Sequence, residues 1–140
     1  MPADRPASWR MNVPGLSEPP GYSHVAVARG SKLVFTAGQV PLDEAGNLVG
    51  PGDLVAQTRQ TLANLEATLA EAGATPDDVV KTTVYVVASE QEDLPAAWRA
   101  FQEFAAPGLR SAPSTLLGVP GLGYTGQLVE IEAVAVLDER

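Results

Sequence analysis

The stretch from Val79 to Val87 constrains the fold of this chain more than any other part of the sequence. It reads Val-Val-Lys-Thr-Thr-Val-Tyr-Val-Val and is dense in β-branched residues, which favour strands. Polar and apolar residues alternate too weakly for a strand with one face in water. We therefore predict a central strand in a sheet whose two faces are both covered, and the rest of the chain must supply that cover.

Two helices are predicted, one before and one after this strand. Between residues 54 and 72, apolar or small residues recur at alternating steps of three and four, which marks one side of a helix. These residues are Val55, Thr58, Leu62, Leu65, Leu69 and Ala72. Asp53 is placed to cap the helix and Gly73 to end it. The second helix is predicted over about 93–105, with Pro95 in its first turn. On one side of it lie Leu94, Trp98, Phe101 and Phe104 or Ala105, and we interpret the aromatic residues as core.

Four further strands are predicted, which gives the order ββαβαββ. Residues 24–28 and 33–37 are separated by a segment of hairpin length, so we expect them to form an antiparallel pair. The last two strands, about 115–119 and 128–137, are joined by a glycine-rich loop. Gly121–Gly126 in that loop matches the GxGxxG pattern of dinucleotide sites, but a strand follows it instead of a helix, so we interpret it as a plain loop.

The 140 residues suffice for one domain. Residues 1–20 are rich in proline, which excludes a regular helix and predicts an extended arm before a single domain over 21–140. The element order indicates an α+β class, a mixed sheet with two helices on one face. No segment is left to cover the opposite face, so we expect a homo-oligomer.

Composition excludes several classes of function. The chain has no cysteine and one histidine, so thiol chemistry and zinc sites built on cysteines or on several histidines of one chain are excluded. A net charge of −8 disfavours nucleic acid as a partner. The sequence has no apolar run of membrane-spanning length and no apolar signal segment near its start, so we expect no membrane partner and a cytoplasmic location.

Two carboxylates stand out on the last strand. The two-residue period of a strand places Glu130 and Glu132 on the same face, about 7 Å apart. Such a pair is unusual on an otherwise apolar strand. One alternative is that one carboxylate lies in a pocket, where burial would raise its pKa into the range of a general base. The other is that both carboxylates are solvated on an edge strand and protect that strand from aggregation.

Two further groups of residues are candidates for a site. His24 begins the first strand beside small residues, which leaves space for a ligand, and Tyr22 is placed to line the same pocket. A purely structural role for this histidine is the other interpretation. Ser114 and Thr115 provide hydroxyls at the start of a strand. They suit hydrogen bonding better than nucleophilic attack, because there is no GxSxG motif and no second histidine.

Five motifs, taken in order, resemble those of the reactive intermediate deaminase (RidA, YjgF-like) family over roughly residues 20–137. They are Gly21–His24, Leu33–Leu42, Gln57–Leu65, Val79–Val86 and Val129–Ala135. The resemblance implies a chorismate-mutase-like fold and a homotrimer whose sheets form an inner barrel, with pockets in clefts between subunits. It also implies hydrolysis of enamines and imines, such as 2-aminoacrylate, to 2-keto acids and ammonia without a metal or organic cofactor.

The resemblance assigns roles to some residues and departs from the family at others. Glu130 matches the glutamate that positions water, and Tyr22 matches the pocket tyrosine. Ala37 stands where the best-known branch usually has serine, and His24 where it commonly has glutamine.

The largest departure concerns the arginine of a Pro-Ala-Arg-Ser segment, which in that branch clamps the substrate carboxylate. Its position here is Ser114, and the nearest arginine, Arg110, lies four residues earlier. A carboxylate without that clamp would lose its hydration without compensation. Two alternatives follow from this. Arg110 could reach the pocket from its loop, or the site could prefer a neutral substrate held by Ser114, Thr115 and His24.

The leading hypothesis is an enamine or imine hydrolase with its site in an intersubunit cleft. Glu130 would be the base that positions water and His24 a proton shuttle, with Tyr22, Ser114, Thr115 and Arg110 contacting the substrate. The alternative is a non-catalytic trimer that binds a small molecule in the same cleft. Ribonuclease activity, a label attached to some relatives, is disfavoured by the acidic charge and the lack of a histidine pair.

Overall fold

A computed structural model describes residues 8–138 of the protein. Its elements in chain order are β1 (Ser8–Met11), β2 (Val25–Ala28), β3 (Lys32–Phe35), α1 (Leu54–Glu71), the 3₁₀ turn η1 (Pro76–Asp78), β4 (Val79–Val87), α2 (Asp93–Phe104), the short α3 (Pro107–Arg110), β5 (Ser114–Val119) and β6 (Val129–Leu137). The order predicted from the sequence is present, with β1, η1 and α3 in addition. No helix within residues 8–138 is long and apolar enough to cross a membrane.

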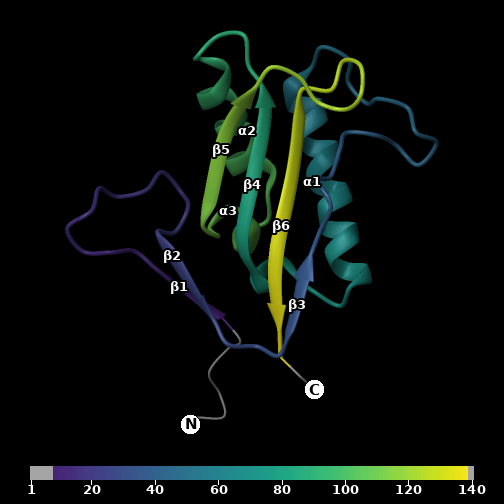
Figure 1. The fold of residues 1–140 in the computed structure, drawn as a ribbon. Coiled ribbons are helices and arrows are strands. Elements are labelled where there is room, and N and C mark those ends of the chain that lie inside the picture. Colours follow the sequence, from purple (N-terminus) through teal and green to yellow (C-terminus); the bar gives the residue numbers. More distant parts are fainter. Residues whose placement is uncertain (1–7, 139–140) are drawn as a thin grey trace.

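Four strands form the main sheet, in the order β3-β6-β4-β5 (Figure 1). β4 runs parallel to β5 and antiparallel to β6, and β3 runs antiparallel to β6, so the sheet is mixed. β4 is an inner strand, as its β-branched sequence predicts. β6 is also an inner strand, so of the two alternatives for its glutamates, the one in which they protect a sheet edge is wrong.

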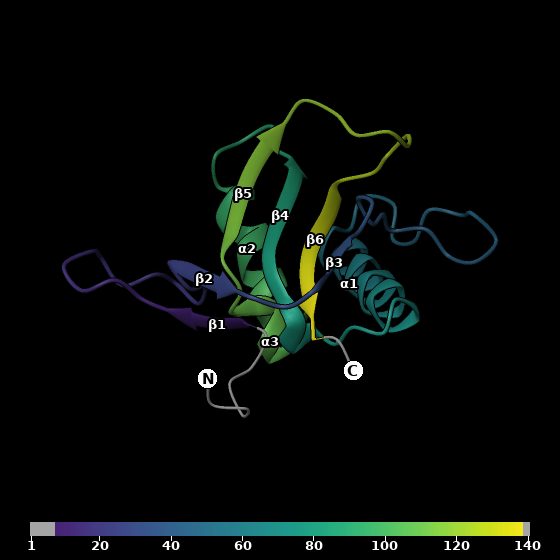
Figure 2. The same cartoon turned by 60° about the horizontal axis from the view of Figure 1, so that its bottom comes forward.

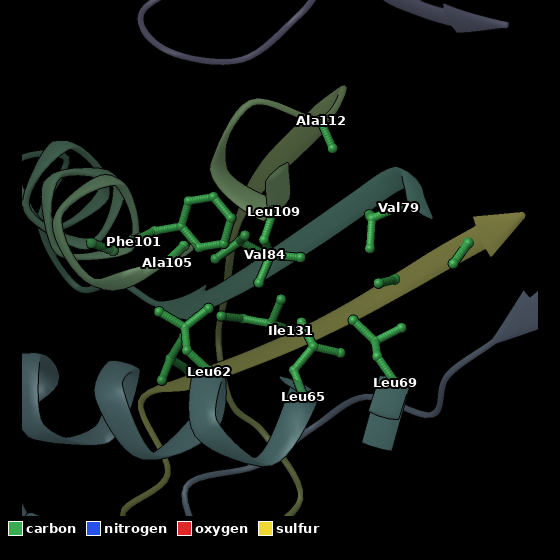
Figure 3. Packing of buried hydrophobic residues seen from close by; sticks show 14 of the residues in the cluster. Leu62, Leu65, Leu69, Val79, Val84, Phe101, Ala105, Leu109, Ala112 and Ile131 are labelled. Carbon is green, nitrogen blue, oxygen red and sulfur yellow. The ribbon is translucent and has the colours of Figure 1, made fainter. Parts of the chain in front are cut away.

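Both long helices cover the same face of this sheet (Figure 2). Asp53 caps α1 by accepting a hydrogen bond from the Ala56 N–H at 3.0 Å, and Gly73 follows the helix with φ +85°, as expected of a stop signal. The core lies between helices and sheet, where Leu65 and Phe101 meet Ile131 in the space shown in Figure 3.

The first two predicted strands do not form a hairpin, and that prediction is wrong. β2 pairs antiparallel with β1, from the predicted arm, in a separate two-stranded ribbon, while β3 pairs with β6. The ribbon lies at the β5 side of the molecule, away from β3 (Figures 1 and 2). The connecting segment crosses the end of β6 so closely that a Cβ at Gly30 would overlap the carbonyl oxygen of Leu137. Loop length alone suggested a hairpin, but the long free edge of β6 offers β3 a better partner than the short β2.

The face of the main sheet opposite the helices is open. On β3, Leu33 is 59% exposed and Phe35 is 70% exposed, and on β5, Leu117 is 42% exposed. The strand period places Tyr85, Glu130 and Glu132 on this same face. We call it the open sheet face. It carries both the largest exposed apolar side chains of the sheet and the paired carboxylates.

Candidate functional site

A pocket of about 440 Å³ lies between the arm, the first half of α2 and the start of β5. It is lined by Pro20, Tyr22, Gln91, Leu94, Pro95, Trp98, Ser114 and Leu116. Two of the residues predicted for the site, Tyr22 and Ser114, therefore line one cavity. Mostly apolar walls with a few polar groups are typical of small-molecule sites.

Aromatic side chains build one wall of this pocket and tie the arm to α2. The Trp98 indole N–H donates a 2.9 Å hydrogen bond to the carbonyl of Pro20, and its ring stacks on the buried Phe101 with ring centres 5.1 Å apart. The edge of Tyr22 meets the Trp98 ring at 6.1 Å between ring centres. Trp98 belongs to the core stripe of α2, as predicted, but it also faces the cavity.

Ser114 is directed to the helix side of the sheet by its position at the start of β5. Its hydroxyl accepts a 2.7 Å hydrogen bond from the Thr82 hydroxyl, which is fully buried on β4. This bond uses an acceptor site of Ser114 and leaves the Ser114 hydrogen for a ligand. Ser114 therefore offers the pocket a fixed, uncharged hydrogen-bond donor.

Thr115 and Arg110 do not line this pocket. Thr115 is the next residue on β5, so its side chain projects to the open sheet face, where it accepts a 2.6 Å hydrogen bond from the Lys81 ammonium. The Arg110 guanidinium donates to the carbonyl of Gln102 at 3.1 Å, and the Gln102 amide donates to the Arg110 carbonyl at 2.9 Å. Within this chain the arginine is thus tied to the end of α2.

His24 lies next to the pocket and is tied to the arm through both ring nitrogens. Nδ1 accepts a hydrogen bond from the Val13 N–H at 2.9 Å, so Nε2 carries the proton, and it lies 3.0 Å from the carbonyl of Ser17. The ring lies 6.3 Å from that of Tyr22. This arrangement agrees with the structural interpretation of His24, and its proton-shuttle role stays a prediction.

Glu130 lies on the open sheet face, on the other side of the sheet from Ser114. One carboxylate oxygen accepts a 3.1 Å hydrogen bond from the amide of Gln127, which is buried and also donates to the Val129 carbonyl. On its other side the carboxylate lies against Gly38, where a Cβ would overlap it. The Glu130 carboxylate is therefore held between the buried side-chain amide of Gln127 and the backbone of Gly38.

Glu132 shares the open sheet face with Glu130, as the strand period predicts, but it has a partner of its own. The Tyr85 hydroxyl donates a short hydrogen bond to it. That bond, together with burial and the charges of both glutamates, raises the pKa of Tyr85 above its ordinary value. Of the two carboxylates, Glu130 alone accepts from an amide and lies beside a glycine.

Comparisons with known proteins identify the family. A family model described as Endoribonuclease L-PSP matches residues 16–137. A RutC family protein of Haemophilus influenzae is 52% identical over 54 residues. This match covers only 39% of this chain and 41% of the length of that relative. The 3-aminoacrylate deaminase RutC of Acinetobacter baylyi is 29% identical, with 88% of this chain and 94% of the relative covered. The structure of YyfB from Yersinia pestis, described as a Rid-family protein of unknown function, has a TM-score of 0.82 and 38% identity over 94% of this chain and 99% of that one. The chain belongs to the RidA/YjgF family.

The motif-based resemblance and the α+β fold class predicted from the element order are therefore confirmed. This RidA-family chain carries its candidate residues in two separate half-sites. The first, which we call the pocket half, contains Tyr22 and Ser114. The second, the carboxylate half, contains Glu130 with Gln127 and Gly38 on the open sheet face. One β-sheet lies between them, so a single chain does not bring the two halves together.

Several residues of the two half-sites in this RidA-family chain were not found from the sequence. Gln91 and Trp98 line the pocket half, and Gln127 supports the carboxylate half. Trp98 lies at the helical spacing of core residues, so its contact with the pocket could not be predicted from the sequence. Gln127 sits in a loop, and the only available signal was a polar residue three positions before Glu130. In the part of the chain that the structure describes, no cluster of three or more His, Cys, Asp or Glu side chains is arranged to hold a metal ion.

Proposed function

We propose that this protein hydrolyses small imines or enamines to carbonyl compounds and ammonia in a cleft between two copies of the chain. The observation that carries the proposal is the division of the site into a pocket half and a carboxylate half on opposite sides of one sheet. In a RidA-family chain, this division is what a site shared between neighbouring subunits requires, with each subunit lending one half to each of two clefts.

The exposed apolar residues support a homotrimer as the assembly. Leu33, Phe35 and Leu117 leave large apolar side chains in water on the open sheet face, a pattern that usually marks an interface. Packing this face against neighbouring copies would bury these side chains and bring Glu130 to the boundary with the next subunit. The arrangement fits the inner barrel that family resemblance implies.

The chemistry requires a positioned water and a route for two protons from that water to the nitrogen. The water oxygen adds to the imine carbon while Glu130 accepts a proton from that water. That proton is delivered to the nitrogen to give a carbinolamine. Glu130 then takes the proton of the carbinolamine hydroxyl and passes it to the nitrogen as well, so that the C–N bond breaks and ammonia leaves as the C=O bond forms. Gln127 and Gly38 fix the orientation of the Glu130 carboxylate, which keeps the water in line with its target.

The pocket half would hold the substrate during these steps. Ser114 donates a hydrogen bond to the polar end of the substrate, and the ring of Tyr22 forms a wall beside it. Arg110 and His24 keep the roles predicted from the sequence only if a neighbouring copy or a ligand changes their present hydrogen bonds. Thr115 accepts from Lys81 and keeps its own hydroxyl hydrogen for a ligand on the open sheet face.

One observation favours a second candidate function, a trimer that binds a small molecule without converting it. The pocket half is complete within one chain and needs no carboxylate to hold a ligand. Calorimetry would distinguish the two functions. Micromolar binding with no turnover of any imine supports the binding protein, and turnover excludes it.

Imine hydrolysis by mixed oligomers tests the proposed function. Glu130→Gln should lower the acceleration of imine hydrolysis at least about 100-fold, because an amide is a poor base. Leu116→Trp should fill the pocket half and abolish turnover as well. When the two inactive variants are co-expressed, random assembly places a wild-type pocket beside a wild-type Glu130 in about a quarter of the clefts, so about a quarter of the activity should return.

The matched control is Glu132→Gln, which makes the same change two residues along the strand and should retain most of the activity. Mixed oligomers with no recovered activity, from variants that each assemble normally, would contradict a shared site. Full activity of Glu130→Gln would contradict the assignment of the base.

A further inference from the structure

We infer that the pocket half selects imines or enamines that lack a carboxylate and carry an apolar substituent. The inference rests on the proposed function for its chemistry, but it concerns which molecules enter the site. It is drawn from the charge, the hydrogen bonds and the shape of the pocket lining.

The lining of the pocket carries no charged side chain. All eight residues that line the pocket are uncharged, and their polar groups are the Tyr22 and Ser114 hydroxyls, the Gln91 amide and the Trp98 indole N–H. The indole N–H already donates to the carbonyl of Pro20. A carboxylate in this pocket would therefore give up its water for at most a few neutral hydrogen bonds, an unfavourable exchange for an anion.

The nearby cations Arg110, Arg10 and Lys81 are bound elsewhere. The Arg110 guanidinium donates to the carbonyl of Gln102. The Arg10 guanidinium donates to the carbonyl of Val79 at 2.6 Å and to the Ser111 hydroxyl at 2.8 Å. Lys81 is on the open sheet face, bound to Thr115. Each of these three cations has hydrogen-bond partners of its own and none of them lines the pocket.

The walls of the pocket are mostly apolar. Leu94, Pro95 and Leu116 line the cavity together with the aromatic pair of Tyr22 and Trp98. Such walls stabilise an apolar or aromatic substituent by removing its surface from water. The Ser114 hydroxyl, which accepts from Thr82, then has one hydrogen to donate to the substrate nitrogen or to the carbonyl oxygen of the product.

The reaction balances for this class of substrate. Water adds its oxygen to the imine carbon, and both of its protons pass through Glu130 to the nitrogen, the first during addition and the second as the carbinolamine hydroxyl becomes the carbonyl. The C–N bond then breaks to give an aldehyde or ketone and ammonia. An enamine first takes a proton on its carbon and gives up one from its nitrogen to water, and thereby becomes the imine. No oxidant, reductant or second substrate other than water is consumed.

Two imines that differ only in a carboxylate test the selectivity. An amine oxidase acting on 2-phenylethylamine generates the imine of phenylacetaldehyde, and an amino-acid oxidase acting on phenylalanine generates the imine of phenylpyruvate. We expect the wild-type protein to accelerate hydrolysis of the first at least about tenfold more than that of the second. An equal or greater acceleration for the phenylpyruvate imine overturns the inference.

Substitution of the pocket serine provides the gain-of-function arm. Ser114→Arg places a guanidinium in the pocket and should reverse the preference in favour of the carboxylate-bearing imine. The matched control is Ser89→Arg, the same change at an exposed position outside the pocket lining, which should leave the preference unchanged within about twofold. A reversal by both variants would show that overall charge, and not the pocket, sets the selectivity, and would overturn the inference.

Calorimetric titration of the wild-type protein separates failure of the inference from failure of the proposed function. Phenylacetamide should bind at least about tenfold more tightly than phenylacetate, a comparison that needs no turnover and no variant. If this preference is found while neither imine is hydrolysed faster than in buffer, the inference on ligand class stands and the proposed hydrolase function fails. Equal binding of both ligands, tighter binding of phenylacetate or binding of neither ligand overturns the inference.

Discussion

Phe35 offers the most direct test of the assembly on which the site depends. Its side chain is 70% exposed on the open sheet face of the isolated chain. Complete burial of a phenylalanine side chain stabilises by about 1.5–3 kcal/mol, so burial of the exposed part of Phe35 would contribute about 1–2 kcal/mol per copy. In a trimer this amounts to about 3–6 kcal/mol for three copies, all of which Phe35→Ala would remove.

This free energy translates into a measurable change of concentration. A loss of about 3–6 kcal/mol weakens trimer formation about 10²–10⁴-fold, and the midpoint concentration varies as the square root of the dissociation constant of three chains. Phe35→Ala should therefore raise the midpoint of dissociation about 10–100-fold. A dilution series followed by sedimentation velocity or light scattering measures this shift, and hydrolysis of imines should fall over the same concentration range.

The control is Val55→Ala, because Val55 is 47% exposed in α1 and lies in the helix layer instead of on the open sheet face. It should leave the midpoint unchanged. The circular dichroism of Phe35→Ala should match that of the wild-type chain, since the ring contributes little to the core of one chain. The reasoning is refuted if the wild-type protein is monomeric at micromolar concentration, or if Phe35→Ala dissociates at the same concentration as wild type.

Three further predictions concern hydrogen bonds around the carboxylate half. Gln57→Leu should lower the free energy of unfolding by about 2–4 kcal/mol in urea titrations, because the fully buried amide of Gln57 satisfies two backbone carbonyls and one backbone N–H in the loops beside it. Gln127→Leu should lower kcat for imine hydrolysis about tenfold or more with a smaller effect on KM, because Glu130 loses the donor that orients it. Glu132→Gln should lower the pKa of Tyr85 toward its ordinary value, because the strong hydrogen bond from the phenol to the carboxylate is lost together with the negative charge beside it, and titration of the tyrosinate absorbance in the ultraviolet measures the change.

Each of these predictions has a control. Gln60→Leu makes the same change in α1 at a residue whose amide donates one hydrogen bond to Asn64, and it should cost less than about 1 kcal/mol. For Gln127, a KM that rises while kcat stays constant would contradict a positioning role. Tyr85→Phe identifies the absorbance that belongs to Tyr85. Because folding raises the pKa of this phenol, its contribution to stability is complete below about pH 10 and is lost as the pH rises through the folded-state pKa, and the opposite trend would refute the assignment.

Local sequence patterns predicted most of the secondary structure because local forces decide it. The central strand lies at Val79–Val87 as its β-branched residues indicate, and α1 starts and ends at the expected cap and glycine. The strand period also placed Glu130 and Glu132 on one face. In each case neighbours a few residues apart carry the information, through dihedral preference, capping or side-chain alternation.

Pairing over long distances in the sequence was predicted less well. The hairpin of residues 24–28 with 33–37 is absent, because β3 takes the free edge of β6 and β2 joins β1. Both partners lie outside the segment whose length suggested a hairpin, and a local pattern carries no information about a competing edge. The edge-strand alternative for the two glutamates failed for the same reason, since β3 covers the edge of β6.

The sequence by itself determined the family, the class of fold and the chemical identity of the candidate residues, because motifs, periodicity and residue type are local properties. Only the tertiary structure decided how those residues are grouped. It placed Ser114 and Glu130 on opposite sides of one sheet, joined Trp98 and Gln91 to the pocket half, and fixed Glu130 with the buried amide of Gln127. Which side chains share a cavity depends on strand order and on the packing of helices against the sheet, and these follow from the free energy of the whole chain.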